Sequence, residues 1–364
     1  MFKIGTHDGA FQCDESLACA MLMMLPRYKD AQIIRTRNSD LLASCDIVVD
    51  VGGEFDSKRN RYDHHQKGFD HSMNSLDNRK KWRIKLSSAG LVFFYFGREI
   101  IAHLLSFDPA DPVVEEIFDQ VYKRFVCEVD AHDNNIPIAD GPTNYVSCTS
   151  LPKRVSYLVP RWTETNPDYD SAFDKAMTLV GDEFKDMVNH YGKDWWPARK
   201  VVEKAVEERF EVHGSGRVIN LPSTGGGRLD WKSHIFSVEK SKKIDFKNNI
   251  LFVIYEDQNK VWNITCVPKN GQKSLRCGLP SAWRGLPEAE LKVKSGIKGI
   301  RFVHSGGFKG QADTKEDVLK MVDKSLESDQ VIHIIAYMYK CLNFMEGGPG
   351  HVLSKVGEKI MRMG

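Results

Sequence analysis

Residues 45–56 read CDIVVDVGGEFD, and this stretch decides the fold class. Its apolar run of Ile and Val does not alternate with polar residues, which is typical of a strand buried on both faces of a parallel sheet. Asp50 ends the run, and Gly52-Gly53 allow a sharp turn because glycine adopts backbone conformations closed to other residues. We therefore predict an α/β fold in which residues 46–51 form a strand of a parallel sheet.

Strands and helices alternate on both sides of this stretch. The apolar patterns predict strands at residues 2–6 and 31–36, and helices at 14–25, 88–105 and 113–129. Such alternation is typical of a parallel sheet covered by helices.

The second half of the chain has a different pattern. Helical patterns at residues 169–190 and 197–209 are followed by predicted strands at 217–221, 234–238, 251–255 and 261–267, and by helices at 315–325 and 330–345. We predict one α/β domain over residues 1–190, a linker helix over 191–208 and a smaller mixed α/β domain over 209–364.

Composition excludes several classes of protein. The 364 residues are 41% hydrophobic and 27% charged, with a mean hydropathy of −0.39, which is typical of a folded globular chain. No apolar run approaches the ~20 residues of a membrane span, and the eight cysteines form no C-x-x-C pair. The N-terminus resembles neither a secretory nor a transit peptide. We expect a soluble intracellular protein with no membrane partner.

Charge divides unequally between the halves. Residues 1–190 hold 22 Lys and Arg against 29 Asp and Glu, a net charge of −7, whereas residues 191–364 hold 29 against 20, a net charge of +9. One interpretation is that the first half collects cations and the second attracts anions. The other is that both halves are solvated surfaces of unequal charge.

Four clusters of Asp and His lie in the acidic half, two of them directly after predicted strands. They are GTHDGAFQCDE at 5–15, CDIVVDVGGEFD at 45–56, RYDHHQKGFDH at 61–71 and FVCEVDAHDNNI at 125–136. A single Asp at a strand end is more often a helix cap than a ligand. Four such clusters favour a metal centre, because carboxylates buried close together cannot all stay ionised without a cation.

The ligand types indicate the chemistry. Mixed imidazoles and carboxylates without a cysteine pair favour manganese or magnesium over a structural zinc. The set suffices for two ions, which could share a bridging carboxylate and activate a hydroxide for attack on phosphorus. The predicted reaction is phosphoester hydrolysis.

The order and spacing of these clusters resemble the DHH phosphoesterase superfamily, which includes RecJ-type exonucleases. The wider set of GTHDG, CDIVVDVGGEFD, RYDHHQ, KLSSAGLVF, LPSAWRGL and FVHSGGFKG is similar to the MYG (melanocyte proliferating gene) exonuclease family over nearly the whole chain. The resemblance implies a parallel-sheet DHH-type domain, a DHH-associated domain after it, and an active site in the cleft between them. It also implies metal-dependent 3′-to-5′ exonuclease action on RNA.

Carried onto this sequence, the resemblance implies metal ligands at His7, Asp14, Asp50, Asp63, His64 and Asp130, with Asp50 bridging the two ions. Asp63 is either a ligand or a carboxylate that orients a histidine. His65 could ligate, donate a proton to the leaving group or bind phosphate. The expected catalytic residues are thus His64, His65, Asp50 and Asp63. The chain departs from the family pattern at Gln12, where histidine is usual, so one metal is expected to bind more weakly.

The basic half offers candidate substrate-binding residues. FVHSGGFKG at 302–310 resembles the glycine-rich motif of DHH-associated domains, and its backbone N–H groups could form an anion-binding nest. A glycine turn on a basic surface is the alternative interpretation. Arg276, Trp283 and Arg284 could contact phosphate and stack a base, although Trp283 would equally suit a core. The predicted substrate-binding residues are Arg301, His304, Ser305, Gly306, Gly307, Lys309 and Arg284.

The leading hypothesis is a two-metal 3′-to-5′ exonuclease on single-stranded RNA or a short oligonucleotide, with manganese preferred and magnesium possible. One alternative is a phosphatase or pyrophosphatase that acts on short oligonucleotides or nucleoside bisphosphates. Another is a nucleic-acid-binding protein with a degenerate metal site, which Gln12 keeps open. A homo-oligomer is compatible with the sequence. Cytoplasm and nucleus are the expected compartments, and the resemblance adds the mitochondrion.

Overall fold

The computed structural model describes residues 1–227, 229–270, 272 and 274–329. The chain divides into two compact units, Met1–Trp196 and Pro197–Gly364. This division falls inside the segment 191–208, for which the sequence predicts a linker helix. The helix predicted at 330–345 lies outside the described residues.

The first unit is built on a five-stranded sheet. Its strands are β1 (Lys3–Thr6), β2 (Gln32–Arg35), β3 (Ile47–Val49), β4 (Phe55–Asp56) and β5 (Arg61–Tyr62), in the order β2-β1-β3-β5-β4. All neighbours run parallel except β4, which pairs antiparallel with β5 at the edge. The predicted parallel sheet is therefore confirmed, with one antiparallel edge strand added.

Both faces of this sheet are covered, as the Ile and Val runs predicted. Ile47 and Val49 of β3 face the main core, and Val48 between them packs with Leu42 of α2 (Ser39–Ala43) on the other face. Because successive side chains of a strand point to opposite faces, a strand buried on both sides needs an unbroken apolar run.

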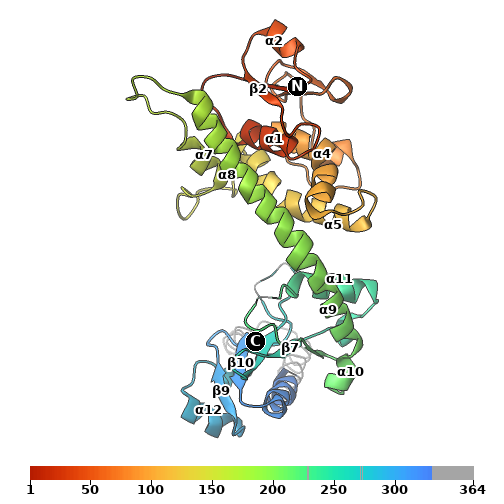
Figure 1. Cartoon of the computed structure of the whole chain (residues 1–364). Coiled ribbons are helices and arrows are strands. Elements are labelled where there is room, and N and C mark those ends of the chain that lie inside the picture. Colours follow the sequence, from red (N-terminus) through yellow and green to blue (C-terminus); the bar gives the residue numbers. More distant parts are fainter. Residues whose placement is uncertain (228, 271, 273, 330–364) are drawn as a thin grey trace, which may run out of the picture. The chain divides into compact units, whose positions relative to one another are not determined.

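The main core face carries most of the helices. Helix α1 (Cys13–Met23) is buried around nearly its whole circumference and contacts α4 (Ser88–Leu105) and the long α8 (Tyr169–Asn189) (Figure 1). The remaining helical segments of this unit are η1 (Ser57–Arg59), α3 (Met73–Leu76), α5 (Pro112–Val121), the π-helical η2 (Tyr122–Val126), α6 (Cys127–Asp133), α7 (Leu151–Ser156) and the π-helical η3 (His190–Trp195).

Helix α4 is long and apolar enough to cross a membrane by length and composition. Among the described residues no other helix passes this test. Its side chains are instead largely inside the unit, since 56% of the helix is buried there and Leu91, Phe93 and Ile100 are fully enclosed. These features are typical of the central helix of a folded core.

The second unit holds a mixed five-stranded sheet. Its strands are β6 (Val218–Asn220), β7 (Phe252–Glu256), β8 (Trp262–Cys266), β9 (Ile300–Val303) and β10 (Lys309–Ala312), in the order β6-β7-β8-β10-β9. Strands β6 and β7 are parallel, and the other pairs are antiparallel.

Helices cover both faces of this second sheet. One face packs against α9 (Trp196–Glu207) and α11 (Lys232–Ser241), and the other against α12 (Glu288–Ser295) and the helical residues 315–329. The short segments α10 (Arg209–Val212), η4 (Phe246–Asn248) and η5 (Ser281–Trp283) complete the unit.

The strand predicted at 234–238 is wrong, because these residues lie in α11. The segment contains Ile235 and Val238, whose β-branched side chains favour strands locally. The buried residues of α11 are nevertheless spaced as one face of a helix, His234 and Ile235 followed by Val238 and Glu239. Packing of that face against the sheet outweighs the local preference.

Candidate metal centre

The carboxyl ends of the parallel strands bring three sequence clusters together. His7 follows β1, Asp50 follows β3, and Asp63 to His65 follow β5. The N-terminal turn of α1 adds Asp14 and Glu15, and the last residue of α6 is Asp133. Because parallel strands end at the same edge, residues far apart in sequence meet at one site.

Two groups of possible ligand atoms lie side by side. His7 Nε2 lies 3.0 Å from Glu15 Oε1 and 3.4 Å from Asp50 Oδ2. His64 Nε2 lies 3.1 Å from Asp50 Oδ1, 3.2 Å from Asp133 Oδ2 and 3.8 Å from an oxygen of Asp14. The two groups, which share the Asp50 carboxylate, are together called the ligand cluster: His7, Asp14, Glu15, Asp50, His64 and Asp133.

The geometry of the cluster can hold metal ions. Within each of the sets His7–Glu15–Asp50 and Asp14–His64–Asp133, one ligand atom per residue lies within 4.8 Å of the others. The same holds for a third set, Asp50, His64 and the exposed His65, so His65 could also ligate. The two oxygens of Asp50 face different histidines, which is the arrangement that a bridging carboxylate requires.

Asp50 is held in an unusual backbone conformation. Its φ of 59° lies in the left-handed region, which a non-glycine residue seldom adopts, and its side chain is almost fully buried. Gly52 and Gly53 follow with φ of 100° and 69°, and the Gly53 N–H donates to Asp63 Oδ2 at 2.6 Å. Backbone strain of this kind persists where surrounding structure enforces it, and it concentrates at functional sites.

Burial and charge act together on the protonation of the cluster. Burial raises the pKa of the Asp14 carboxyl well above its usual range, and neighbouring carboxylates raise it further. Burial also opposes ionisation of Asp50, but hydrogen bonds with two histidines lower its pKa. Burial lowers the pKa of His7, yet its bonds to Asp50 and Glu15 outweigh burial and raise it to about 10. The carboxylates thus compete for too little positive charge, a conflict that a divalent cation would relieve.

Unpartnered polar atoms provide a second test of the fit to a metal. Among the described residues, Asp14 Oδ1, Glu15 Oε2 and His64 Nδ1 are buried without a hydrogen-bond partner. Leaving such an atom unsatisfied costs about 1–3 kcal/mol, and more if it is charged. The donor set of carboxylates and imidazoles suits hard or borderline divalent ions. The residues present therefore fit a divalent metal site.

Asp63 lies beside the ligand cluster and accepts hydrogen bonds from the backbone of the two residues that follow it. Its Oδ1 accepts hydrogen bonds from the backbone N–H groups of His64 and His65, at 2.7 and 3.1 Å, and lies 2.8 Å from His65 Nδ1. Of the two roles left open for Asp63, these contacts favour the carboxylate that orients a histidine. The His65 side chain itself is 59% exposed, and its Nδ1 lies 3.6 Å from Asp50.

The structure gives Asp130 partners outside the ligand cluster. Asp130 is fully buried, and its carboxylate accepts bonds from the Ser87 N–H at 3.0 Å, the Ser87 hydroxyl at 2.8 Å and the Tyr122 hydroxyl at 2.9 Å. Burial raises its pKa to about 7, against these bonds, which lower it. Asp133, three residues further along the helix, is the residue of α6 whose carboxylate lies in a group that could hold a metal ion.

A pocket of about 580 Å³ opens onto this centre. Its lining joins ligand residues to Gln12, Arg37 and Gln66, together with the exposed His65. The Arg37 guanidinium lies 3.2 Å from Asp8 and is largely exposed. Gln12 lies at the rim, where its backbone N–H donates to Glu15 Oε1 at 2.7 Å. A positive group and an exposed imidazole thus face the space in front of the ligand cluster.

The predicted substrate-binding residues of the second unit converge on one turn between β9 and β10. His304, Ser305, Gly306 and Gly307 form the turn, and an added Cβ at Gly307 would lie 2.4 Å from Arg284 Nε. However, the Gly306 N–H donates to His304 Nδ1 at 2.9 Å and the Gly307 N–H to the His304 carbonyl at 2.8 Å. The predicted nest of free N–H groups is therefore wrong, because both groups are already bonded inside the turn.

The neighbouring side chains have varied roles. Arg301 pairs with Asp313, Arg276 forms a two-pronged ion pair with Glu239, and Lys309 begins β10. Trp283 is 4% exposed and lies in the core, as its alternative interpretation proposed.

Sequence reasoning missed Glu15, Asp133 and Arg37 as members of the site. Glu15 directly follows Asp14 in the first cluster, and Asp133 stands in the fourth, so both carried a visible signal. Arg37 follows β2 at the same sheet edge as the other strand ends, which is the signal that could have found it.

Comparisons with known proteins identify relatives along most of the chain. The MYG1 exonuclease family model, described as "Uncharacterised protein family (UPF0160)", matches residues 3–326. The chain is 46% identical to the MYG1 exonuclease of Mus musculus and 45% identical to that of Homo sapiens, over 89% of this chain and 84% and 85% of the relatives. A MYG1 protein of Saccharomyces cerevisiae is 38% identical, over 89% of this chain and 95% of its own length.

Proposed function

The chain belongs to the MYG1 exonuclease family, and from this membership we propose that it is a metal-dependent phosphodiesterase acting at the ligand cluster. One observation carries the proposal. Three buried carboxylates and two buried histidines, with Asp133 beside them, converge at the carboxyl ends of parallel strands. Two of these residues, His7 and Asp50, line a pocket large enough for a nucleotide. No folded core requires such a concentration of charge.

We propose two divalent ions, with manganese preferred and magnesium accepted. One would be held by His7, Glu15 and Asp50, and the other by Asp14, His64 and Asp133, with Asp50 between them. Bound ions of this kind activate water and neutralise negative charge on a phosphate. The mixture of imidazole and carboxylate, without a thiolate in either group, supports manganese.

The remaining residues of the pocket have roles of their own. Asp63 accepts a hydrogen bond from His65 Nδ1, which fixes the ring and leaves Nε2 as the free nitrogen of a largely exposed imidazole. We assign His65 as the proton donor to the leaving oxygen. Arg37 would bind a non-bridging phosphate oxygen, exchanging its exposed contact with Asp8 for a charge-assisted bond to the substrate.

We propose single-stranded RNA as the substrate and 3′-to-5′ as the direction. The names of the mouse and human relatives support an exonuclease. The +9 charge of residues 191–364 supports an anionic polymer, since basic surfaces attract nucleic-acid backbones. Arg301 and Lys309 are the cations that we expect to contribute most.

The test compares Asp50→Asn with Asp46→Asn, a control at the other end of the same strand. Asp46 accepts a bond from the Lys3 backbone and is exposed. With 5′-labelled RNA and manganese, we expect the natural chain to release a ladder of products. Asp50→Asn should lose on the order of a thousandfold or more in rate, whereas Asp46→Asn should not.

Direction and substrate length are read from the same assay. A 3′-terminal block should stop hydrolysis of a 5′-labelled RNA, while a 5′ block should not. Equal rates in EDTA and manganese would refute the metal-dependent mechanism. Hydrolysis restricted to dinucleotides or nucleoside bisphosphates would replace the exonuclease by a small-molecule phosphatase.

A further inference from the structure

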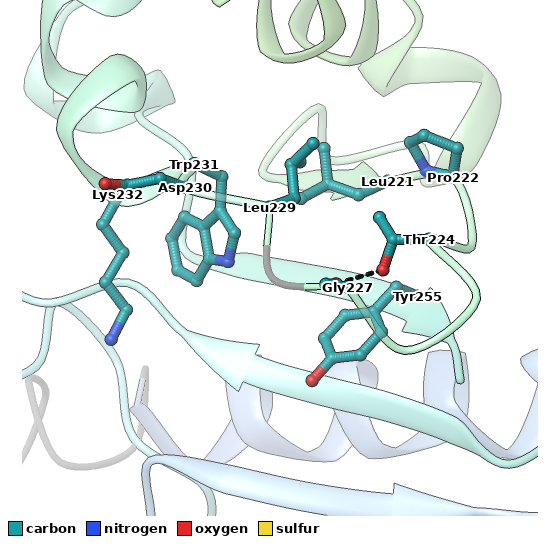
Figure 2. A pocket seen from close by; sticks show the side chains of 9 residues that line it. All are labelled: Leu221, Pro222, Thr224, Gly227, Leu229, Asp230, Trp231, Lys232 and Tyr255. Carbon is teal, nitrogen blue, oxygen red and sulfur yellow. Dashed lines mark hydrogen bonds between the residues drawn. The ribbon is translucent and has the colours of Figure 1, made fainter. Parts of the chain in front are cut away.

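A second pocket lies wholly within the second unit, at the carboxyl ends of the parallel strands β6 and β7 (Figure 2). The chain passes from β6 into α11 and returns in β7, which makes a β-α-β unit; residues 221–227 and 229–231 lie between β6 and α11. This pocket is on the β6 edge of the sheet, whereas the turn carrying His304 lies between β9 and β10, at the opposite edge. Its volume is about 290 Å³, and the residues that line it include Thr224, Gly227, Asp230, Trp231, Lys232 and Tyr255.

Two aromatic rings face this space from different elements. Trp231 precedes the first turn of α11, and Tyr255 comes from β7; Figure 2 shows both rings beside Gly227. Trp231 is only 8% exposed and packs with Leu221 and Ile235 in the core below, so its ring is held in place without a ligand. Tyr255 is half-buried. Preorganised aromatic rings bind planar groups by stacking at little entropic cost.

The polar members of the lining carry both signs of charge. Asp230 and Lys232 flank Trp231 in sequence, and the Lys232 ammonium lies 5.6 Å from the centre of the indole ring. The Thr224 hydroxyl donates a hydrogen bond to the Gly227 carbonyl, which closes the turn beside the pocket. Gly225 and Gly226, with φ of 61° and 98°, allow the backbone to make that turn.

We propose that this pocket binds one nucleotide, with its base against Trp231 and Tyr255 and its phosphate at Lys232. Asp230 would accept hydrogen bonds from a sugar hydroxyl or an exocyclic amine. Aromatic rings, one cation and one acceptor match the three chemical parts of a nucleotide, whereas an acyl chain would use neither the cation nor the acceptor. The volume is at the lower limit of ~300–1,000 Å³ for ligand pockets, which suits a single nucleotide better than a longer chain. The site lies apart from the ligand cluster in sequence and needs no metal, so it goes beyond the proposed hydrolysis.

The nucleotide could be a free mononucleotide or the end of an RNA, and calorimetry on the full chain in EDTA distinguishes these sources. Removing metals keeps the ligand cluster from contributing. We expect saturable binding of AMP or CMP at one site if the ligand is free. If a 5′-phosphorylated RNA tetramer binds and neither AMP nor CMP does, the occupant of the same pocket is the end of an RNA. Ribose 5-phosphate serves as the ligand without a base, and it should bind at least tenfold more weakly than AMP.

Two variants and two matched controls test the contacts. Tyr255→Leu should weaken binding about tenfold through lost stacking, and Lys232→Ala should weaken it several-fold and reduce its salt dependence. Lys240→Ala removes an exposed cation at the other end of α11, and Tyr157→Leu removes an exposed ring of the first unit, so both should bind as the natural chain does.

The proposal is overturned if no nucleotide or tetramer gives saturable binding in EDTA, or if Tyr255→Leu and Lys232→Ala bind like the controls. It is also overturned if ribose 5-phosphate binds as well as AMP, because the pocket would then recognise only an anion. Loss of hydrolysis in Asp50→Asn, with nucleotide binding in EDTA unchanged, would show that the two sites are independent.

Discussion

Substitution of Gly90 by alanine should destabilise the first unit, although the same change in an isolated helix stabilises it by about 1 kcal/mol. Gly90 lies in the first turn of α4, and a Cβ built there would lie 2.3 and 2.5 Å from the two oxygens of Asp130. Atoms cannot approach so closely, and Asp130 is fully buried. The carboxylate must therefore move away from Ser87 and Tyr122, which it now binds.

The expected magnitude follows from these contacts. Overpacking a core costs about 1–3 kcal/mol. A hydrogen bond to a charged group contributes about 1.5–3 kcal/mol, and at least one of the three is expected to break. After subtracting the gain in helix propensity, we expect a net loss of about 2–4 kcal/mol. For a unit of this size that is a decrease in melting temperature of about 5–10 °C.

Thermal unfolding of the full chain measures the effect, and Gly181→Ala in α8 is the matched control. There the added Cβ would lie 3.3 Å from Ala20 Cβ and 3.6 Å from Met24 Cε, so we expect a change within about 1 kcal/mol. In an Asp130→Ala background, the Gly90 substitution should become neutral or stabilising, because the clash is gone. Equal destabilisation in both backgrounds would refute the reasoning. Since Asp130 anchors the helix that carries Asp133, Gly90→Ala should also weaken manganese binding.

Three further predictions concern stabilisation by manganese, the loss of stability at low pH, and Gln12 in the first cluster. Manganese at 100 times its dissociation constant should stabilise the chain by about 2.7 kcal/mol in thermal unfolding, and Asp14→Asn should remove most of this gain; no shift with metal would contradict the site. Burial raises the pKa of Glu115, but Arg98 and Lys80 outweigh burial and hold this pKa at about 2, below the usual ~4.3. These ion pairs therefore stabilise the fold above pH ~4.3, and their contribution disappears as the pH falls towards 2. Melting curves between pH 6 and 2 should show this loss in the natural chain and less of it in Glu115→Gln. Gln12→His should tighten the weaker of two manganese sites in calorimetry, because imidazole is the better ligand for a borderline ion; unchanged affinity and rate would place Gln12 outside the coordination of either ion.

Much of the candidate site could be read from the sequence because parallel strands end together. An unbroken run such as Ile47 to Val49 predicts a strand buried on both faces, and the polar residue after it then stands at the edge where an α/β sheet binds its ligands. His7 and Asp50 were placed in this way and His64 by the family resemblance, and the structure brings all three within one cluster. The apolar run is a local feature of the sequence, and the meeting of strand ends at one edge holds for any parallel sheet.

Residues on helices could not be placed by the same reasoning. Asp130 and Asp133 lie on α6, and the sequence favoured Asp130, whereas the structure turns Asp130 towards Ser87 and Asp133 towards His64. Residues 122–126, immediately before α6, are π-helical, and a π-helical turn contains more residues than an α-helical turn. The side chains of α6 therefore point in directions rotated about the helix axis from those that a continuous α-helix would give. Which acidic residue faces the ligand cluster therefore depends on a helical phase that periodicity does not reveal.

The remaining differences also come from packing between distant segments. The sequence by itself determined the α/β class, the strand ends and most of the acidic centre, because apolar periodicity and residue chemistry are local properties. Only the tertiary structure decided that 234–238 is a helix, that Gly306 and Gly307 use their N–H groups inside their own turn, and that Glu15 is buried against His7. Each of these depends on which surfaces meet, and contact free energy between distant segments outweighs the local preference of a few residues.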